Sequence, residues 1–115
     1  MKRGDIVIAD LRPHDPKAKV RPVLVVQNDR DNARMSQTIV VVVTGNTARS
    51  AEPTQLLIDQ SHPDWAPSGL HHPSVVNCSN LYTIGQQYVS RVIGSLSAAT
   101  MSQVDNCLKA ALGIS

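Results

Sequence analysis

The sequence predicts a mainly β fold, a small antiparallel barrel completed by a C-terminal α-helix. Five short segments rich in β-branched residues are separated by turn residues, and the last twenty residues change to a helical pattern. At 115 residues the chain is long enough for one core but not for two, so residues 1–115 are expected to form a single domain. A strongly curved sheet is the natural way to bury five short strands in one domain.

Each of the five segments is too short and too rich in β-branched residues to favour a helix. The expected strands are 5–11, 22–27, 38–43, 54–59 and 74–79. Between the last two lies QSHPDWAPSGLHHP, which contains three prolines and one glycine and is therefore predicted to be a loop.

The C-terminal segment carries the signals of an amphipathic helix. Ser97 is a good N-cap, and Met101, Val104, Leu108 and Leu112 recur after it at three- and four-residue spacing. A glycine follows Leu112 and supplies the stop. We expect the apolar stripe of this helix to pack on the sheet or in a dimer contact.

Composition predicts an aliphatic core. The chain is 42% hydrophobic but has no Phe, and its aromatic residues are Trp65, Tyr82 and Tyr88. Few aromatic side chains are therefore present to stack on bases, although Trp65 could either stack on RNA or cover one end of the barrel. The net charge of +2 permits an RNA partner without requiring one.

Cysteine and histidine spacing predicts reduced thiols and no metal site. Cys78 and Cys107 lie far apart in sequence, and the four histidines have no partners at the spacing of a metal site. Acidic residues interrupt the N-terminal apolar segment, and no later run approaches the roughly 18 apolar residues of a membrane span. We expect a cytoplasmic protein with no membrane association.

The arginine of VRPVLVVQND has a structural and a functional interpretation. A residue before proline is pushed into extended geometry, so Arg21-Pro22 can simply mark the beginning of an edge strand. An arginine at the mouth of a strand also presents a fork of donors that fits a phosphate group.

Four motifs occur in a fixed order, MKRGDIVIADL, RPVLVV, VVTGNT and PSVVNCSNLYTI, and VIGSLSAATMSQVDNCLKAALGI closes the chain. Together they resemble the MazF/PemK family of toxins from bacterial toxin–antitoxin pairs. The resemblance covers nearly the whole chain. It implies an SH3-like barrel that acts as a homodimer, cleaves single-stranded RNA without a metal or other cofactor, leaves a 2′,3′-cyclic phosphate, and is neutralised by an acidic antitoxin.

The resemblance also implies two catalytic residues. Arg21 matches the active-site arginine of the family, and its permanent charge suits it to stabilise negative charge on the phosphate. Thr44 matches the threonine after the third strand, where a hydroxyl can donate to a phosphate oxygen. Asn46 follows in a tight turn and is a candidate RNA contact, although Thr-Gly-Asn also ends strands in many proteins.

One wall of the site departs from the family pattern. PemK relatives carry an arginine and an aspartate for acid–base work where this sequence has Asn77 and Ser79, which can bind RNA but cannot transfer protons at neutral pH. His14, in the loop between the first two strands, is therefore the candidate acid or base, and the alternative is an exposed loop histidine with no role. Lys17 and Lys19 in the same loop are candidate phosphate contacts or ordinary solvated lysines.

Two alternative functions remain. CcdB-like toxins look similar at this level and bind DNA gyrase without cutting RNA, but they end in Trp-Gly-Ile, where this chain has Leu112 before Gly113 and Ile114. A degenerate toxin that binds RNA or antitoxin without cleavage is favoured by the departures at Asn77 and Ser79.

Overall fold

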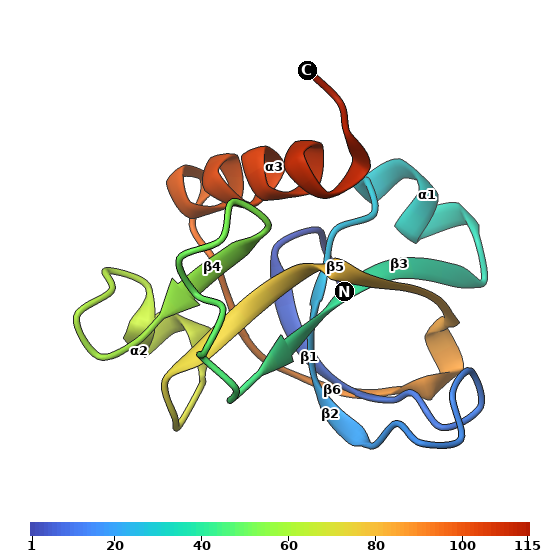
Figure 1. The fold of residues 1–115 in the computed structure, drawn as a ribbon. Coiled ribbons are helices and arrows are strands. Elements are labelled where there is room, and N and C mark those ends of the chain that lie inside the picture. Colours follow the sequence, from blue (N-terminus) through green and yellow to red (C-terminus); the bar gives the residue numbers. More distant parts are fainter.

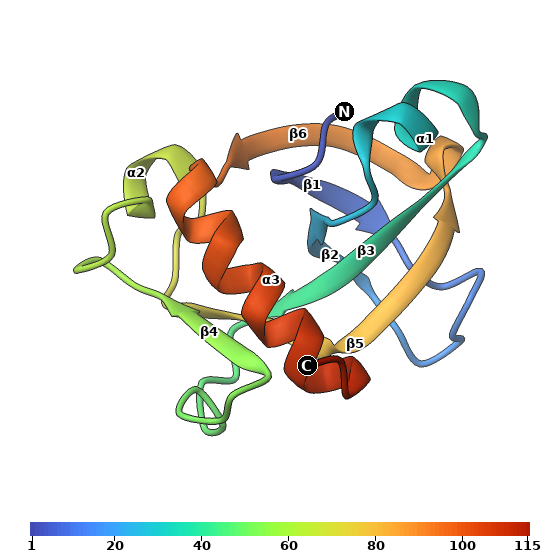
Figure 2. The same cartoon turned by 90° about the horizontal axis from the view of Figure 1, so that it is seen from above.

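The protein is a curved six-stranded antiparallel sheet with one long helix lying across one of its faces (Figure 1, Figure 2). The computed structural model describes all residues from Met1 to Ser115. In chain order the elements are β1 (Asp5–Asp10), β2 (Val20–Val25), α1 (Asp29–Arg34), β3 (Gln37–Thr44), β4 (Gln55–Ile58), α2 (Trp65–Ser68), β5 (Ser74–Gly85), the 3₁₀ turn η1 (Gln86–Tyr88), β6 (Val89–Ser95) and α3 (Ala98–Leu112). The strand order is β4-β5-β3-β2-β1-β6.

The predicted mainly β fold with a C-terminal helix is confirmed, with two corrections. The sheet is not a closed barrel, because β4 and β6 form its two edges and do not pair with each other. The fifth expected strand continues to Gly85, and a sixth strand, β6, pairs with β1. All residues of β6 are exposed or half-buried, and its sequence, VSRVIGS, lacks the apolar run that marks the other strands.

Two short helices were not predicted. The six residues of α1 are too few to show helical periodicity, and the cap decides its beginning, because the Asn28 side chain accepts a hydrogen bond from the Asp31 N–H at 2.9 Å. The expected loop over residues 60–73 contains α2, which ends at Gly69.

The caps predicted for the C-terminal helix are confirmed. Ser97 Oγ accepts from the Thr100 N–H at 3.3 Å, and Gly113 ends the helix with a φ of 69°. The apolar stripe is shorter than expected: Met101 and Val104 are buried, but Leu112 is 57% exposed. No helix has both the length and the apolar character needed to cross a membrane.

Both faces of the sheet are buried, and both core layers are aliphatic as predicted. The helix-side layer, between the sheet and α3, consists of Ile6, Leu24, Val41, Val43, Ile58, Leu70, Val76, Cys78, Leu96, Met101, Val104 and Cys107. The loop-side layer, on the opposite face, consists of Val7, Ala9, Leu11, Val23, Val25, Val40, Val42 and Ile84. Trp65 packs against the helix-side layer, which supports its interpretation as a cover for the core.

The segment after α2 lies unusually close to β6. Gly69 has a φ of 71°, and a Cβ on it would lie 2.1 Å from the Ile93 carbonyl oxygen. On the other side of this contact, a Cβ on Gly94 would lie 2.3 Å from the Ser68 oxygen. The two glycines therefore allow the segment 69–73 to run against β6, where the two form the walls of a groove described below.

The two cysteines are free and lie in the helix-side layer, Cys78 on β5 and Cys107 on α3. Burial, and to a smaller extent the neighbouring Cys107, raises the pKa of the Cys78 thiol to about 12. Burial also raises the pKa of the Cys107 thiol. At pH 8 we therefore expect neither thiol of the folded protein to react quickly with an aromatic disulfide reagent, since the thiolate is the reactive form. Both should react at once in denaturant, and fast labelling of folded protein would contradict this burial.

Candidate active site

Arg21 and Thr44 lie at the ends of two neighbouring strands. Arg21 is the second residue of β2, opposite Ala9 of β1, and Thr44 is the last residue of β3. The pairing of β2 with β3 ends with Val23 opposite Val42, and the same register continued by two residues places Arg21 opposite Thr44. Because side chains alternate along a strand, both belong to the face that carries the loop-side layer.

Arg21 has an unusual environment for a charged side chain. Its Nε is buried and has no hydrogen-bond partner in the protein. Leaving a buried donor without a partner costs about 1–3 kcal/mol, and more when the group is charged. An anion bound at this end of the strand could accept a hydrogen bond from this donor.

Thr44 begins a tight turn held by side chains. Its Oγ1 accepts from the Asn46 N–H at 3.2 Å, and Asn46 Oδ1 accepts from the Ala48 N–H at 3.1 Å. The Thr44 hydroxyl proton remains available to donate to a phosphate oxygen. Asn46 is exposed and uses its oxygen inside the turn, which leaves only its amide N–H groups for a ligand.

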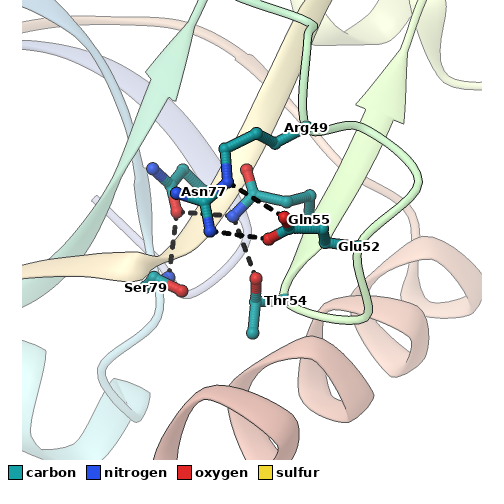
Figure 3. A network of polar contacts seen from close by, with 6 residues as sticks. All are labelled: Arg49, Glu52, Thr54, Gln55, Asn77 and Ser79. Atoms are coloured by element: carbon teal, nitrogen blue, oxygen red, sulfur yellow. Dashed lines mark hydrogen bonds and ion pairs between the residues drawn. The ribbon is translucent and has the colours of Figure 1, made fainter.

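Asn77 and Ser79 lie on β5, next to β3 (Figure 3). Asn77 is opposite Val42, so it shares the face of Thr44 and lies on the diagonal from it, about 7–8 Å away. Its Oδ1 accepts from the Ser79 N–H at 3.0 Å and from Gln55 Nε2 at 2.8 Å. Ser79 is exposed. No signal in the sequence marks Gln55 as a site residue, because only the pairing of β4 with β5 brings it opposite Asn77.

The loop 11–19 crosses the same face of the sheet. Ala18 packs against the loop-side layer, and Asp15 accepts from the hydroxyl of Tyr82 on β5 at 3.5 Å. His14 is exposed and meets Tyr88 edge-on, with ring centroids 5.9 Å apart, and it makes no side-chain hydrogen bond. Lys17 and Lys19, at the other end of the loop, are exposed and in no ion pair, so their charges are free for phosphate groups.

Asp10, at the end of β1, directly precedes this loop. Arg12 donates to it from its side chain at 2.9 Å and from its backbone N–H at 3.0 Å. These bonds lower the pKa of the Asp10 carboxyl to about 2. Asp10 therefore stays ionised at neutral pH and is a poor proton donor.

A groove of about 680 Å³ opens at the same strand ends on the opposite face of the sheet. Its floor includes Pro22 and Val43, the neighbours of Arg21 and Thr44. Arg91 on β6 and the histidines His71 and His72 add polar and positively charged groups to its lining. No group of three or more His, Cys, Asp or Glu side chains is arranged to hold a metal ion.

Comparison with known proteins identifies the family. Residues 2–112 match the model of the PemK-like, MazF-like toxins of type II toxin–antitoxin systems. The chain belongs to this toxin family.

Curated relatives in the PemK/MazF family align over almost the whole chain. Endoribonuclease EndoA of Bacillus subtilis is 33% identical, covering 99% of this chain and 96% of the relative. Endoribonuclease MazF of Staphylococcus saprophyticus is 29% identical, covering 99% of this chain and 92% of the relative. These matches support the endoribonuclease toxin interpretation and not the CcdB-like alternative.

Solved structures in the family share the fold. The Mycobacterium tuberculosis toxin MazF-mt6 superposes with a TM-score of 0.79 at 27% identity, covering 96% of this chain and 98% of that chain. A mycobacterial endoribonuclease in complex with its cognate antitoxin has a TM-score of 0.77 at 26% identity, covering 100% of this chain and 97% of that chain. The chain therefore shares its fold with toxins of this family, one of them in complex with its antitoxin.

Proposed function

We propose that this PemK/MazF-like toxin acts as a single-domain cytoplasmic endoribonuclease that cuts single-stranded RNA and is neutralised by an acidic antitoxin. The 2′-hydroxyl attacks the adjacent phosphorus, forms a 2′,3′-cyclic phosphate and expels the 5′-oxygen, which leaves as a hydroxyl. Because the nucleophile belongs to the substrate, no metal-activated water is needed for the attack, and the proposed step uses no metal or other cofactor, as the family resemblance implies. The observation that carries the proposal is the buried, unpartnered Nε of Arg21 beside Thr44.

Each candidate residue has a role in this reaction. Arg21 stabilises the extra negative charge on the phosphate oxygens, and Thr44 donates its hydroxyl proton to one of them. His14 transfers protons to or from the 2′- and 5′-oxygens, because an imidazole suits this work at neutral pH, whereas the low pKa of Asp10 makes it a poor acid and the amide of Asn77 does not titrate.

Substrate contacts surround this centre. The backbone phosphates of RNA on both sides of the cleaved bond are natural partners for free positive charges, and its bases are partners for amides and hydroxyls. The proposed RNA-binding residues are Lys17, Lys19, Asn46, Asn77 and Ser79.

The decisive experiment incubates the purified protein with mixed-sequence single-stranded RNA in EDTA and analyses the ends of the fragments. We expect 2′,3′-cyclic phosphate and 5′-hydroxyl ends. Single-stranded DNA of the same sequence should remain intact, because it lacks the 2′-hydroxyl. RNA that stays intact, or fragments with 3′-hydroxyl ends, would contradict the proposal.

A degenerate toxin is the second candidate, favoured by Asn77 and Ser79, which cannot transfer protons. The same experiment separates the two. Binding of RNA or of an acidic antitoxin peptide without cleavage at any pH would make this chain a binding protein.

We also expect a homodimer. The edge strand β6 has no strand paired with its outer side, and its Val92, which is 51% exposed, lines the groove. A two-fold pair joined there would bury this valine and extend the groove for an RNA or an antitoxin tail.

Sedimentation at micromolar concentration should give twice the 12.4 kDa chain mass, and Val92→Lys should shift the protein towards monomer. The matched control is Ile114→Lys, which alters an apolar residue that is 58% exposed at the C-terminus. A wild-type monomer would contradict the dimer, and an unaffected Val92→Lys dimer would contradict this interface.

A further inference from the structure

The amide of Asn77 is held in one orientation. A backbone N–H can only donate, so the side-chain atom that meets the Ser79 N–H at 3.0 Å must be the oxygen Oδ1. The Gln55 atom 2.8 Å from that oxygen must then be its NH₂ group, which also donates to Thr54 Oγ1 at 3.0 Å. Gln55 is only 8% exposed, so it keeps this position.

A bulge in β5 makes this arrangement possible. Val42 of β3 is opposite Asn77, but the preceding residue, Val41, is opposite Leu81, so residues 78–80 have no partner on β3. Ser79 lies in this bulge, and its N–H is therefore free to turn back to Asn77. Bulges of this kind redirect side chains and are over-represented next to active sites.

The consequence is that Asn77 presents a donor and no acceptor. Both acceptor positions of Oδ1 are taken by Ser79 and Gln55, whereas the Nδ2 group makes no hydrogen bond within the protein. Asn77 is half-buried and lies diagonally next to Thr44. The free N–H groups are therefore beside the position at which the cleaved phosphate is proposed to bind.

We propose that Asn77 selects RNA by donating a hydrogen bond to an acceptor atom on a base next to the cleaved bond, and that Gln55 is the positioning residue that keeps Asn77 a donor. This inference rests on the proposed function of the site. Gln55 itself does not touch the RNA. Together with the Ser79 N–H, it excludes the flipped amide, which would present an acceptor instead.

Two substitutions replace the donor that residue 77 presents to the RNA with an acceptor, each in a different way. Asn77→Asp keeps an oxygen for Ser79 and Gln55 but replaces the outward NH₂ by a carboxylate oxygen. Gln55→Glu replaces the donor to Asn77 Oδ1 by a carboxylate, which repels that oxygen. We expect the Asn77 amide to turn, because its bond to the carboxylate is charge-assisted and outweighs the lost bond from the Ser79 N–H, and so to present its oxygen. Both variants should lower the preference for the selected base by roughly 2- to 10-fold, the factor that one neutral hydrogen bond supplies.

The readout is the base composition at the fragment ends from mixed-sequence RNA, together with kcat and KM on one preferred RNA. A shared shift of preference in the two variants would support the inference, since a merely structural role of Gln55 would lower activity on all sequences alike. Gln103→Glu makes the same chemical change at an exposed position on α3, against the opposite face of the sheet, and should keep the wild-type preference.

Three results would overturn the inference. The first is an Asn77→Asp variant that keeps the wild-type base preference. This result would overturn the inference even if the charge introduced by Gln55→Glu prevents that variant from folding. The second is an Asn77→Asp variant whose activity falls equally on every sequence, because Asn77 would then contact a phosphate and not a base. The third is wild-type protein without any base preference.

Failure of cleavage itself is measured separately. Mixed-sequence RNA with 2′-methoxy groups lacks the nucleophile and reports binding alone. A wild-type protein that binds this RNA with a preference altered by Asn77→Asp, but cleaves no RNA, would overturn the proposed catalysis and support the role of Asn77. A protein that neither cleaves nor binds RNA would overturn both.

Discussion

Arg21→Ala should lower the rate of RNA cleavage by about 100- to 1,000-fold, which corresponds to roughly 2.7–4 kcal/mol of lost stabilisation of charge in the transition state. The fold should remain intact, because a half-buried side chain at the end of a strand can be truncated without opening a core cavity. The substitution also removes Nε, a buried donor that has no hydrogen-bond partner within the protein. Single-turnover cleavage of one preferred RNA is the measurement.

The control for Arg21 is Arg30→Ala, which removes an exposed positive charge from α1 and should leave the rate unchanged. Thermal unfolding should give similar midpoints for both variants and the wild type. Thr44→Ala should reduce cleavage less than Arg21→Ala, because a neutral hydroxyl stabilises charge less than a guanidinium. Arg21→Ala protein with the wild-type rate would remove Arg21 from the mechanism.

His14→Ala should lower the cleavage rate by something like 10²–10⁴-fold, the range typical of a general acid or base. The wild-type pH–rate profile should show a limb in the neutral range, where histidine is the usual proton-transfer group, and the variant should lose it. Asp10 cannot supply this limb, since the pKa of its carboxyl is lowered to about 2 and it is ionised throughout the neutral range. The profile should be measured between about pH 5.5 and 8, which spans the histidine range.

A second histidine provides the control for His14. His62 Nδ1 accepts from the Asp64 N–H at 3.0 Å, and His62→Asn keeps an acceptor there, so this variant should retain both the limb and the rate. A flat wild-type profile would show that His14 is an ordinary loop residue packed against Tyr88, and that catalysis depends on charge stabilisation by Arg21 and Thr44.

Local signals in the sequence determined most of the elements. The β-branched segments predicted five strands, and Ser97 and Gly113 predicted both ends of α3, because caps and short strands depend on residues close together in the chain. The dipeptide Arg21-Pro22 and the turn after Thr44 also place both candidate catalytic residues at strand ends, and the structure bears out this placement. Their catalytic roles were implied by the resemblance to the MazF/PemK family, and the variants above test them.

Only the tertiary structure decided how these elements pair and pack. The sixth strand has no apolar run of its own, and its pairing with β1 became visible only in the folded sheet. The register of β2 with β3 decides that Arg21 faces Thr44, and the register of β4 with β5 decides that Gln55 faces Asn77. A slip of one residue in either pairing would turn a partner to the other face of the sheet. Register arises from hydrogen bonds between segments distant in the chain and from the bulge at residues 78–80, so inspection of each strand by itself could not reveal it.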